Sequence, residues 1–183
     1  MKKIKLSWPV KITVAAFFLS VIIGVFTNTF VEKVNIFAAF FILLLVILIG
    51  IVFDIIGVSV TVADETPFHS RLTRGYSENR EAIKLIRNAS KVSNFCNDVI
   101  GDIAGVISGG LSAAIAVNII NAYKNLNAAA VSLLLTAVVA AATVGGKAAG
   151  KNVSMKHSEK IVLKVSVIIS LFKKIFSFNK RKK

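Results

Sequence analysis

Three carboxylates stand within long apolar stretches of this sequence, and they are the side chains best placed to do chemistry. Asp54 interrupts the stretch 36–63, while Asp98 and Asp102 interrupt the stretch 95–120. A carboxylate near the middle of a membrane costs about 2.5–3.5 kcal/mol on the insertion scale, so each one needs a reason to be there. A visiting cation is one such reason, and a structural polar contact between helices is the other.

Helical spacing places these acids beside other oxygen-bearing side chains. Asn94, Asp98 and Asp102 recur every fourth residue and therefore share one face of a helix. A second stripe of polar and small residues runs along the preceding helix, and the two stripes can face each other. The residues expected to offer oxygen ligands are Asp54, Ser59, Glu65, Asn94, Asp98 and Asp102. Hard oxygen donors suit Mg²⁺ or Ca²⁺, and the lack of a His or Cys cluster argues against zinc or copper.

The same residues have a structural interpretation that the sequence leaves open. Gly101, Gly105 and Gly109 recur at a spacing typical of closely packed membrane helices. Asp98 is expected about one turn inside the interface, where a carboxylate also serves as a cap or reaches the membrane surface.

Apolar residues are gathered in blocks long enough to cross a bilayer. The chain has 183 residues, of which 55% are hydrophobic and 17% charged, and its mean hydropathy is +0.74. Blocks of about 20 apolar residues match a hydrocarbon core about 30 Å thick. The sequence therefore predicts an all-α integral membrane protein with about four transmembrane helices and cytoplasmic juxtamembrane amphipathic helices.

The four spans are predicted at about 10–30, 36–63, 95–120 and 128–146. Between the second and third, residues 68–91 are strongly charged with apolar side chains at helical spacing. This pattern predicts an amphipathic helix or helix pair on the inner surface, bent near Gly75. For 161–178 an interfacial helix and a fifth span are both open. Lys164 and Lys173 lie only nine positions apart, which favours the interfacial helix.

The net charge of +14 follows the predicted topology. Of 23 Lys and Arg, only Lys33 and Lys124 fall in the two connections predicted to lie outside. The positive-inside rule then predicts that both termini lie in the cytoplasm, and it explains the charge without nucleic acid. The expected location of this multi-pass protein is the plasma membrane. The lone cysteine, Cys96, excludes an intramolecular disulfide and is expected in the core.

Short motifs follow one another in a definite order from the second span onward. Residues 63–66 (Ala-Asp-Glu-Thr) end that span, the polar stretch 86–103 follows, and residues 146–151 (Gly-Lys-Ala-Ala-Gly-Lys) end the fourth span. In this order the chain resembles the transmembrane domain of the CorC/CorB/CNNM magnesium-transport family over roughly residues 40–178. The resemblance implies a dimer that coordinates dehydrated Mg²⁺ with Ser, Asn and backbone oxygens, with Glu65, Gly101 and Asp102 at motif positions.

The chain departs from that family at several points. Lys147 stands where the family has glutamate, Gly150 stands where it has proline, and no pair of nucleotide-sensing CBS domains is expected. On this interpretation, 1–35 form an N-terminal cytoplasmic basic segment with an extra transmembrane helix. Residues 36–178 form the family-like transmembrane domain with its juxtamembrane helices, and 179–183 form a basic cytoplasmic tail.

Two functions are expected. The first is a divalent-cation transporter or transporter-like protein that prefers Mg²⁺ and acts as a homodimer among membrane lipids. No cofactor is expected, apart from Mg²⁺ as a bound ion. The alternative is a non-transporting membrane scaffold of the same fold that binds anionic lipid or a separate regulatory subunit. No Ser/His/Asp, His/Glu metal or Gly-rich phosphate motif stands at a usable spacing, so no enzyme is expected.

Overall fold

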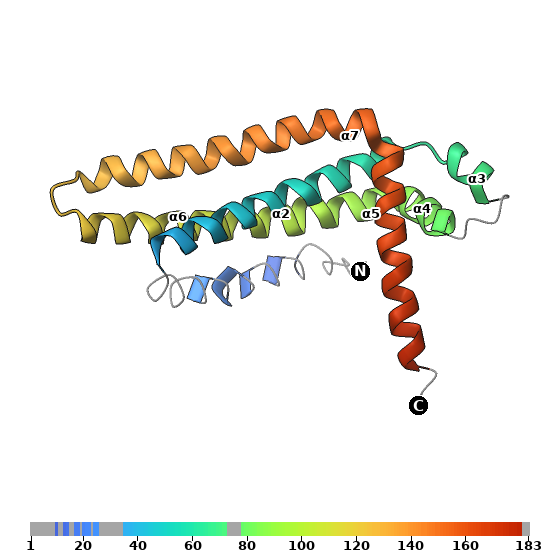
Figure 1. The fold of residues 1–183 in the computed structure, drawn as a ribbon, viewed down its shortest axis with the longest axis horizontal. Coiled ribbons are helices and arrows are strands. Elements are labelled where there is room, and N and C mark those ends of the chain that lie inside the picture. Colours follow the sequence, from blue (N-terminus) through green and yellow to red (C-terminus); the bar gives the residue numbers. More distant parts are fainter. Residues whose placement is uncertain are drawn as a thin grey trace, which may run out of the picture. The chain divides into compact units, whose positions relative to one another are not determined.

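The computed structural model describes residues 35–72 and 78–180, with scattered positions between Val10 and Val25, and it describes side chains as far as Ile175 (Figure 1). These residues form helices and connections, with no strand among them. Most of the predicted first span, about 10–30, lies outside the described residues, as does the predicted bend at Gly75. The all-helical prediction is confirmed for the part of the chain that can be described.

Three helical stretches among the described residues are long and apolar enough to cross a membrane: Ile36–Val62, Ala89–Ala122 and Ala128–Ile175. The first is helix α2, and its bounds agree with the predicted second span. The second combines α5 (Ala89–Asn94), the π-helix η1 (Phe95–Gly101) and α6 (Asp102–Ala122). The third belongs to α7 (Ala128–Lys180). These stretches identify the chain as a membrane protein by length and composition.

The chain separates into two compact units. The first contains the described residues up to Gly50 together with Val99–Gly146. In it, α6 and α7 are joined by a short turn, which Asn127 closes because its Oδ1 accepts hydrogen bonds from the backbone N–H of Ala129 (3.0 Å) and Ala130 (3.2 Å). Gly50 packs against Ala104, whose Cβ would lie 3.0 Å from a Cβ added at position 50. A side chain at position 50 would therefore require the two helices to shift apart by a few tenths of an ångström.

The second unit contains Ile51–Asp98 and Lys147–Lys183. It holds the end of α2, the short helices α3 (Thr66–Leu72) and α4 (Glu78–Arg87), then α5, most of η1 and the later part of α7. Five buried residues form its apolar core: Val60, Phe68, Ala82, Ile83 and Val162. They come from α2, α3, α4 and α7, so the charged segment predicted to be amphipathic packs its apolar side onto this core.

Helix α7 changes direction at His157, whose backbone (φ −130°, ψ 25°) is not helical (Figure 1). The helical segment that follows begins at Ser158 and includes the predicted stretch 161–178. The kink separates this stretch from the predicted fourth span, although both are helical.

Candidate functional site

Asn97 of η1 packs closely against Gly57 of α2 in the second unit. A Cβ added at Gly57 would lie 2.2 Å from Oδ1 of Asn97, so glycine at position 57 leaves room for this side chain in the orientation it adopts. Asn97 donates from Nδ2 to Oγ of Ser93 at 3.3 Å. Its Oδ1 is buried and has no hydrogen-bond donor among the described residues. The contact thus holds an amide oxygen, a good ligand for a hard cation, against the backbone of α2.

The π-helix η1 determines which side chains of this stretch turn inward. Its i→i+5 bonding rotates each residue through a smaller angle than an α-helix does, and such bulges are frequent at functional sites. Asn97 turns toward α2, whereas Asn94, Asp98 and Asp102 are exposed in the described structure. The prediction from the sequence used α-helical spacing throughout, and no residue pattern indicated the π-helix.

Asp54 and Ser59 lie on either side of Gly57 on α2. Asp54 is half-buried and precedes Gly57 by three residues, which places both on one side of the helix. Ser59 is fully buried, and its hydroxyl donates to the carbonyl oxygen of Ile55 at 2.7 Å. Ser59 is therefore bonded to its own helix, while the carboxylate of Asp54 makes no hydrogen bond with the described residues.

The carbonyl oxygen of Ile55 also accepts a hydrogen bond from α7. Ser154 donates to it at 3.0 Å and to the carbonyl oxygen of Gly150 at the same distance. A Cβ added at Gly150 would lie 2.7 Å from Cγ1 of Ile55, so this glycine permits the close approach of the two helices. Sequence reasoning missed Ser154, although a glycine followed four residues later by serine is the small-residue spacing of helix contacts.

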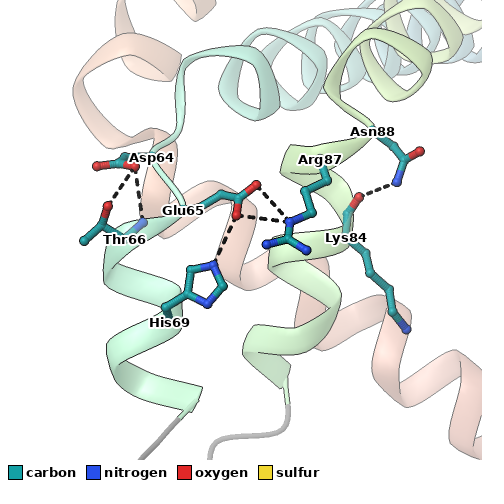
Figure 2. A network of polar contacts seen from close by, with 7 residues as sticks. All are labelled: Asp64, Glu65, Thr66, His69, Lys84, Arg87 and Asn88. Carbon is teal, nitrogen blue, oxygen red and sulfur yellow. Dashed lines mark hydrogen bonds and ion pairs between the residues drawn. The ribbon is translucent and has the colours of Figure 1, made fainter.

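Glu65 is bound by two basic side chains (Figure 2). Its Oε2 lies 3.1 Å from Nε2 of His69, and its carboxylate accepts hydrogen bonds from Nε of Arg87 at 3.2 and 3.3 Å. Hydrogen bonding to His69, and then to Arg87, lowers the pKa of Glu65 below its usual 4.5. Neighbouring Asp64 caps α3 by accepting from the N–H of Thr66 at 3.2 Å. Glu65 thus ties α3 to α4.

A second carboxylate ties α4 to the part of α7 after the kink. Glu81 accepts hydrogen bonds from Lys84 (2.9 Å) and from Lys173 (2.5 Å). The bond from Lys173, and then that from Lys84, lowers the pKa of Glu81 below 4.5. The side chain of Glu81 is 16% exposed, whereas that of Lys173 is 60% exposed. This ion pair was not predicted from the sequence.

Buried hydroxyls also occur in the first unit, on α6. Ser108 and Ser112 are one turn apart and nearly fully buried. Ser108 donates to the carbonyl oxygen of Gly105 at 3.0 Å, while Oγ of Ser112 has no partner among the described residues. A Cβ added at Gly105 or Gly109 would meet no described atom within 4 Å. The described structure therefore uses Gly50, Gly57 and Gly150 for close approach, rather than these two glycines.

The residues described here include no group of three or more His, Cys, Asp or Glu side chains that could hold a metal ion. Here η1 meets α2 through Asn97, whose amide oxygen lies against Gly57. No protein-family model matches the chain, and neither a curated protein nor a solved structure matches it. Fold and site together define a helical membrane protein in which a buried amide oxygen, unpaired among the described residues, packs against α2 one turn from a half-buried aspartate.

Proposed function

We propose that this chain is a divalent-cation transporter or transporter-like protein, with Mg²⁺ as its preferred cargo. It would act in the plasma membrane, with both termini in the cytoplasm, and as a homodimer. The orientation is supported by the distribution of lysine and arginine. The choice of Mg²⁺ and the dimer are supported by the resemblance of residues 40–178 to the magnesium-transport family.

The buried Oδ1 of Asn97 carries this proposal. A buried acceptor without a donor costs about 1–3 kcal/mol, and a cation would offset that cost. Asp54 lies one turn before Gly57 and supplies negative charge to the same side of α2. Asp98 and Asp102 are exposed and do not line this contact, so they would act elsewhere on the route of the ion.

Few protein ligands are needed for this ion. Mg²⁺ prefers six oxygens at about 2.0–2.1 Å and usually keeps several waters, so one or two carboxylates suffice. Ser59 and Glu65 were predicted as ligands, but Ser59 already donates to Ile55 and Glu65 already pairs with Arg87. The proposal therefore depends on Asn97, which the predicted ligand set omitted, and on the aspartates.

Mg²⁺ uptake into proteoliposomes tests the proposal. We expect the full chain to raise Mg²⁺ flux above that of empty liposomes, and Asp54→Asn, Asn97→Ala and Asp102→Ala to bring it back to that level. Glu159→Gln is the matched control, because Glu159 is an exposed acid on α7 outside the candidate site. Flux at the empty-liposome level for the wild type, or equal flux for wild type and all three variants, would overturn the proposal.

The second candidate is a non-transporting membrane scaffold of the same fold that binds anionic lipid or a separate regulatory subunit. Lys147 favours it, since a half-buried cation stands where the resembled family has glutamate. The ties from Glu65 to Arg87 and from Glu81 to Lys173 also favour a unit held in one arrangement. Co-purification of a partner that is lost at high salt, from protein that binds no Mg²⁺, would support this candidate over transport.

A further inference from the structure

The part of α7 after His157 has two sides of different character. One side packs on the second unit, where Val162 and Ser166 are fully buried. Lys173 lies on that same side and pairs with Glu81 of α4. Two independent contacts, one apolar and one ionic, therefore fix which face of this segment turns outward.

The outward face is apolar. Ile168, Leu171, Phe172 and Ile175 are spaced i, i+3, i+4 and i+7, which places them on one stripe. Their exposed fractions are 53%, 52%, 59% and 66%. Four large apolar side chains that are exposed along one helix face indicate contact with an apolar partner.

Lysines border this stripe. Lys164 stands one turn before Ile168 on the same face, and Lys174 flanks it at the other end, both exposed. Neither lysine forms an ion pair among the described residues, whereas Lys173 pairs with Glu81. A stripe of apolar side chains bordered by lysines is complementary to acyl chains beneath negatively charged headgroups.

We propose that the segment of α7 after His157 lies flat on a leaflet that contains anionic phospholipid. Ile168, Leu171, Phe172 and Ile175 contact the acyl chains, and Lys164 and Lys174 contact the phosphates. Glu81 holds Lys173 on the opposite side and so keeps the apolar stripe facing the lipid. This surface is separate from the cation site, and it stands or falls independently of transport.

Nitroxide labels on the full chain test the arrangement. The single native cysteine is replaced by Cys96→Ala, and labels are placed by Ile168→Cys, Ile175→Cys or Ser170→Cys in nanodiscs of phosphatidylcholine with phosphatidylglycerol. Labels at 168 and 175 should collide with oxygen more often than with an aqueous nickel complex. The two labels should also lie at the same depth in the bilayer. The label at 170, on the opposite side, should show less collision with oxygen.

Depth distinguishes lying flat from spanning. Positions 168 and 175 are about 10 Å apart along a helix, so a spanning segment would place them at clearly different depths. Such a difference would overturn the proposal. So would higher collision rates with nickel than with oxygen, which would place the stripe in water. Low collision rates with both reagents would place it against protein, and this too would overturn the proposal.

The charge requirement is tested separately. Each lysine near the surface should favour the docked segment about fivefold at low salt, since a near-surface base contributes about 1 kcal/mol. In the wild-type chain, the labels at 168 and 175 should lie deeper in nanodiscs with phosphatidylglycerol than in phosphatidylcholine alone. The variant Lys164→Gln/Lys174→Gln should lose this difference in depth, while Lys124→Gln, in the turn between α6 and α7, should keep it. Equal depth in phosphatidylcholine alone would show that anionic lipid is not the partner.

Discussion

The hydroxyl of Ser154 donates to the carbonyl oxygen of Ile55, 99 positions earlier in the chain, at 3.0 Å. The same carbonyl oxygen accepts from Ser59 at 2.7 Å. A membrane helix gains no hydrophobic driving force from contact with another helix, so polar contacts of this kind contribute to its packing. Here the bond connects α7 to α2 two residues before Gly57, beside the candidate cation site.

Removing this hydroxyl should destabilise the second unit. We expect Ser154→Ala to lower the free energy of unfolding in detergent by about 1 kcal/mol, because a buried donor is lost at a close helix contact. Ser170→Ala is the control, since Ser170 donates locally to the carbonyl oxygen of Val167. Thermal unfolding followed by circular dichroism measures both, and an equal effect of the two changes would contradict the assigned role.

An added methyl group at position 57 should be costly. In Gly57→Ala the new Cβ would lie 2.2 Å from Oδ1 of Asn97, so this side chain must move and lose its hydrogen bond to Ser93, which costs about 1 kcal/mol. Gly105→Ala should be neutral or stabilising by up to about 1 kcal/mol, because its Cβ meets no described atom and alanine is the better helix former. The double change Gly57→Ala/Asn97→Ala should recover stability. Equal melting temperatures for the two single variants would refute the steric argument.

Phe68 should be the main apolar anchor of α3. It is 1% exposed within the core of the second unit, so Phe68→Ala should cost about 3–5 kcal/mol in unfolding free energy. Phe172→Ala removes the same atoms from a side chain that is 59% exposed and should cost much less in detergent. A denaturant titration of both variants compares them directly, and similar midpoints would mean that α3 is not docked on the core.

The carboxylate of Glu81 should titrate below its usual pKa of 4.5. Lys173 is the larger cause, so Lys173→Gln should raise the pKa of Glu81 more than Lys84→Gln does. Because the folded-state pKa is the lower one, this pair stabilises the fold fully above about pH 4.5, and the contribution is lost as the pH falls through the folded pKa. Carbon-13 NMR titration measures the pKa of Glu81, and the variant Glu81→Gln assigns its signal. An unchanged pKa of Glu81 in Lys173→Gln would contradict the ion pair.

Hydropathy and helical periodicity predicted the larger elements well. The second span was placed at 36–63 and is helix Ile36–Val62, and the third and fourth spans also begin or end within a few residues of helices. This agreement has a simple cause, since the length of an apolar block is set by membrane thickness and survives any detail of packing. Whether the first span forms stays a prediction, because residues 26–34 and others near it lie outside the description.

The arrangement of the polar residues was harder to predict. A period of 3.6 placed Asn94, Asp98 and Asp102 on one face, but the π-helix Phe95–Gly101 changes the rotation, and Asn97 is the residue that turns inward. A π-helix is a response to tertiary packing and leaves no compositional mark. The pairing of Glu81 with Lys173 joins residues 92 positions apart, which local periodicity does not address.

The contact of Gly57 with Asn97 has a consequence for how this sequence can vary over evolutionary time. The two positions should not drift separately: a relative with alanine or serine at 57 needs either a shorter side chain at 97 or a reoriented asparagine, and one that keeps Asn97 in its present orientation must keep glycine at 57. If the amide oxygen serves an ion, natural replacements at 97 should also be restricted to short side chains that retain an oxygen.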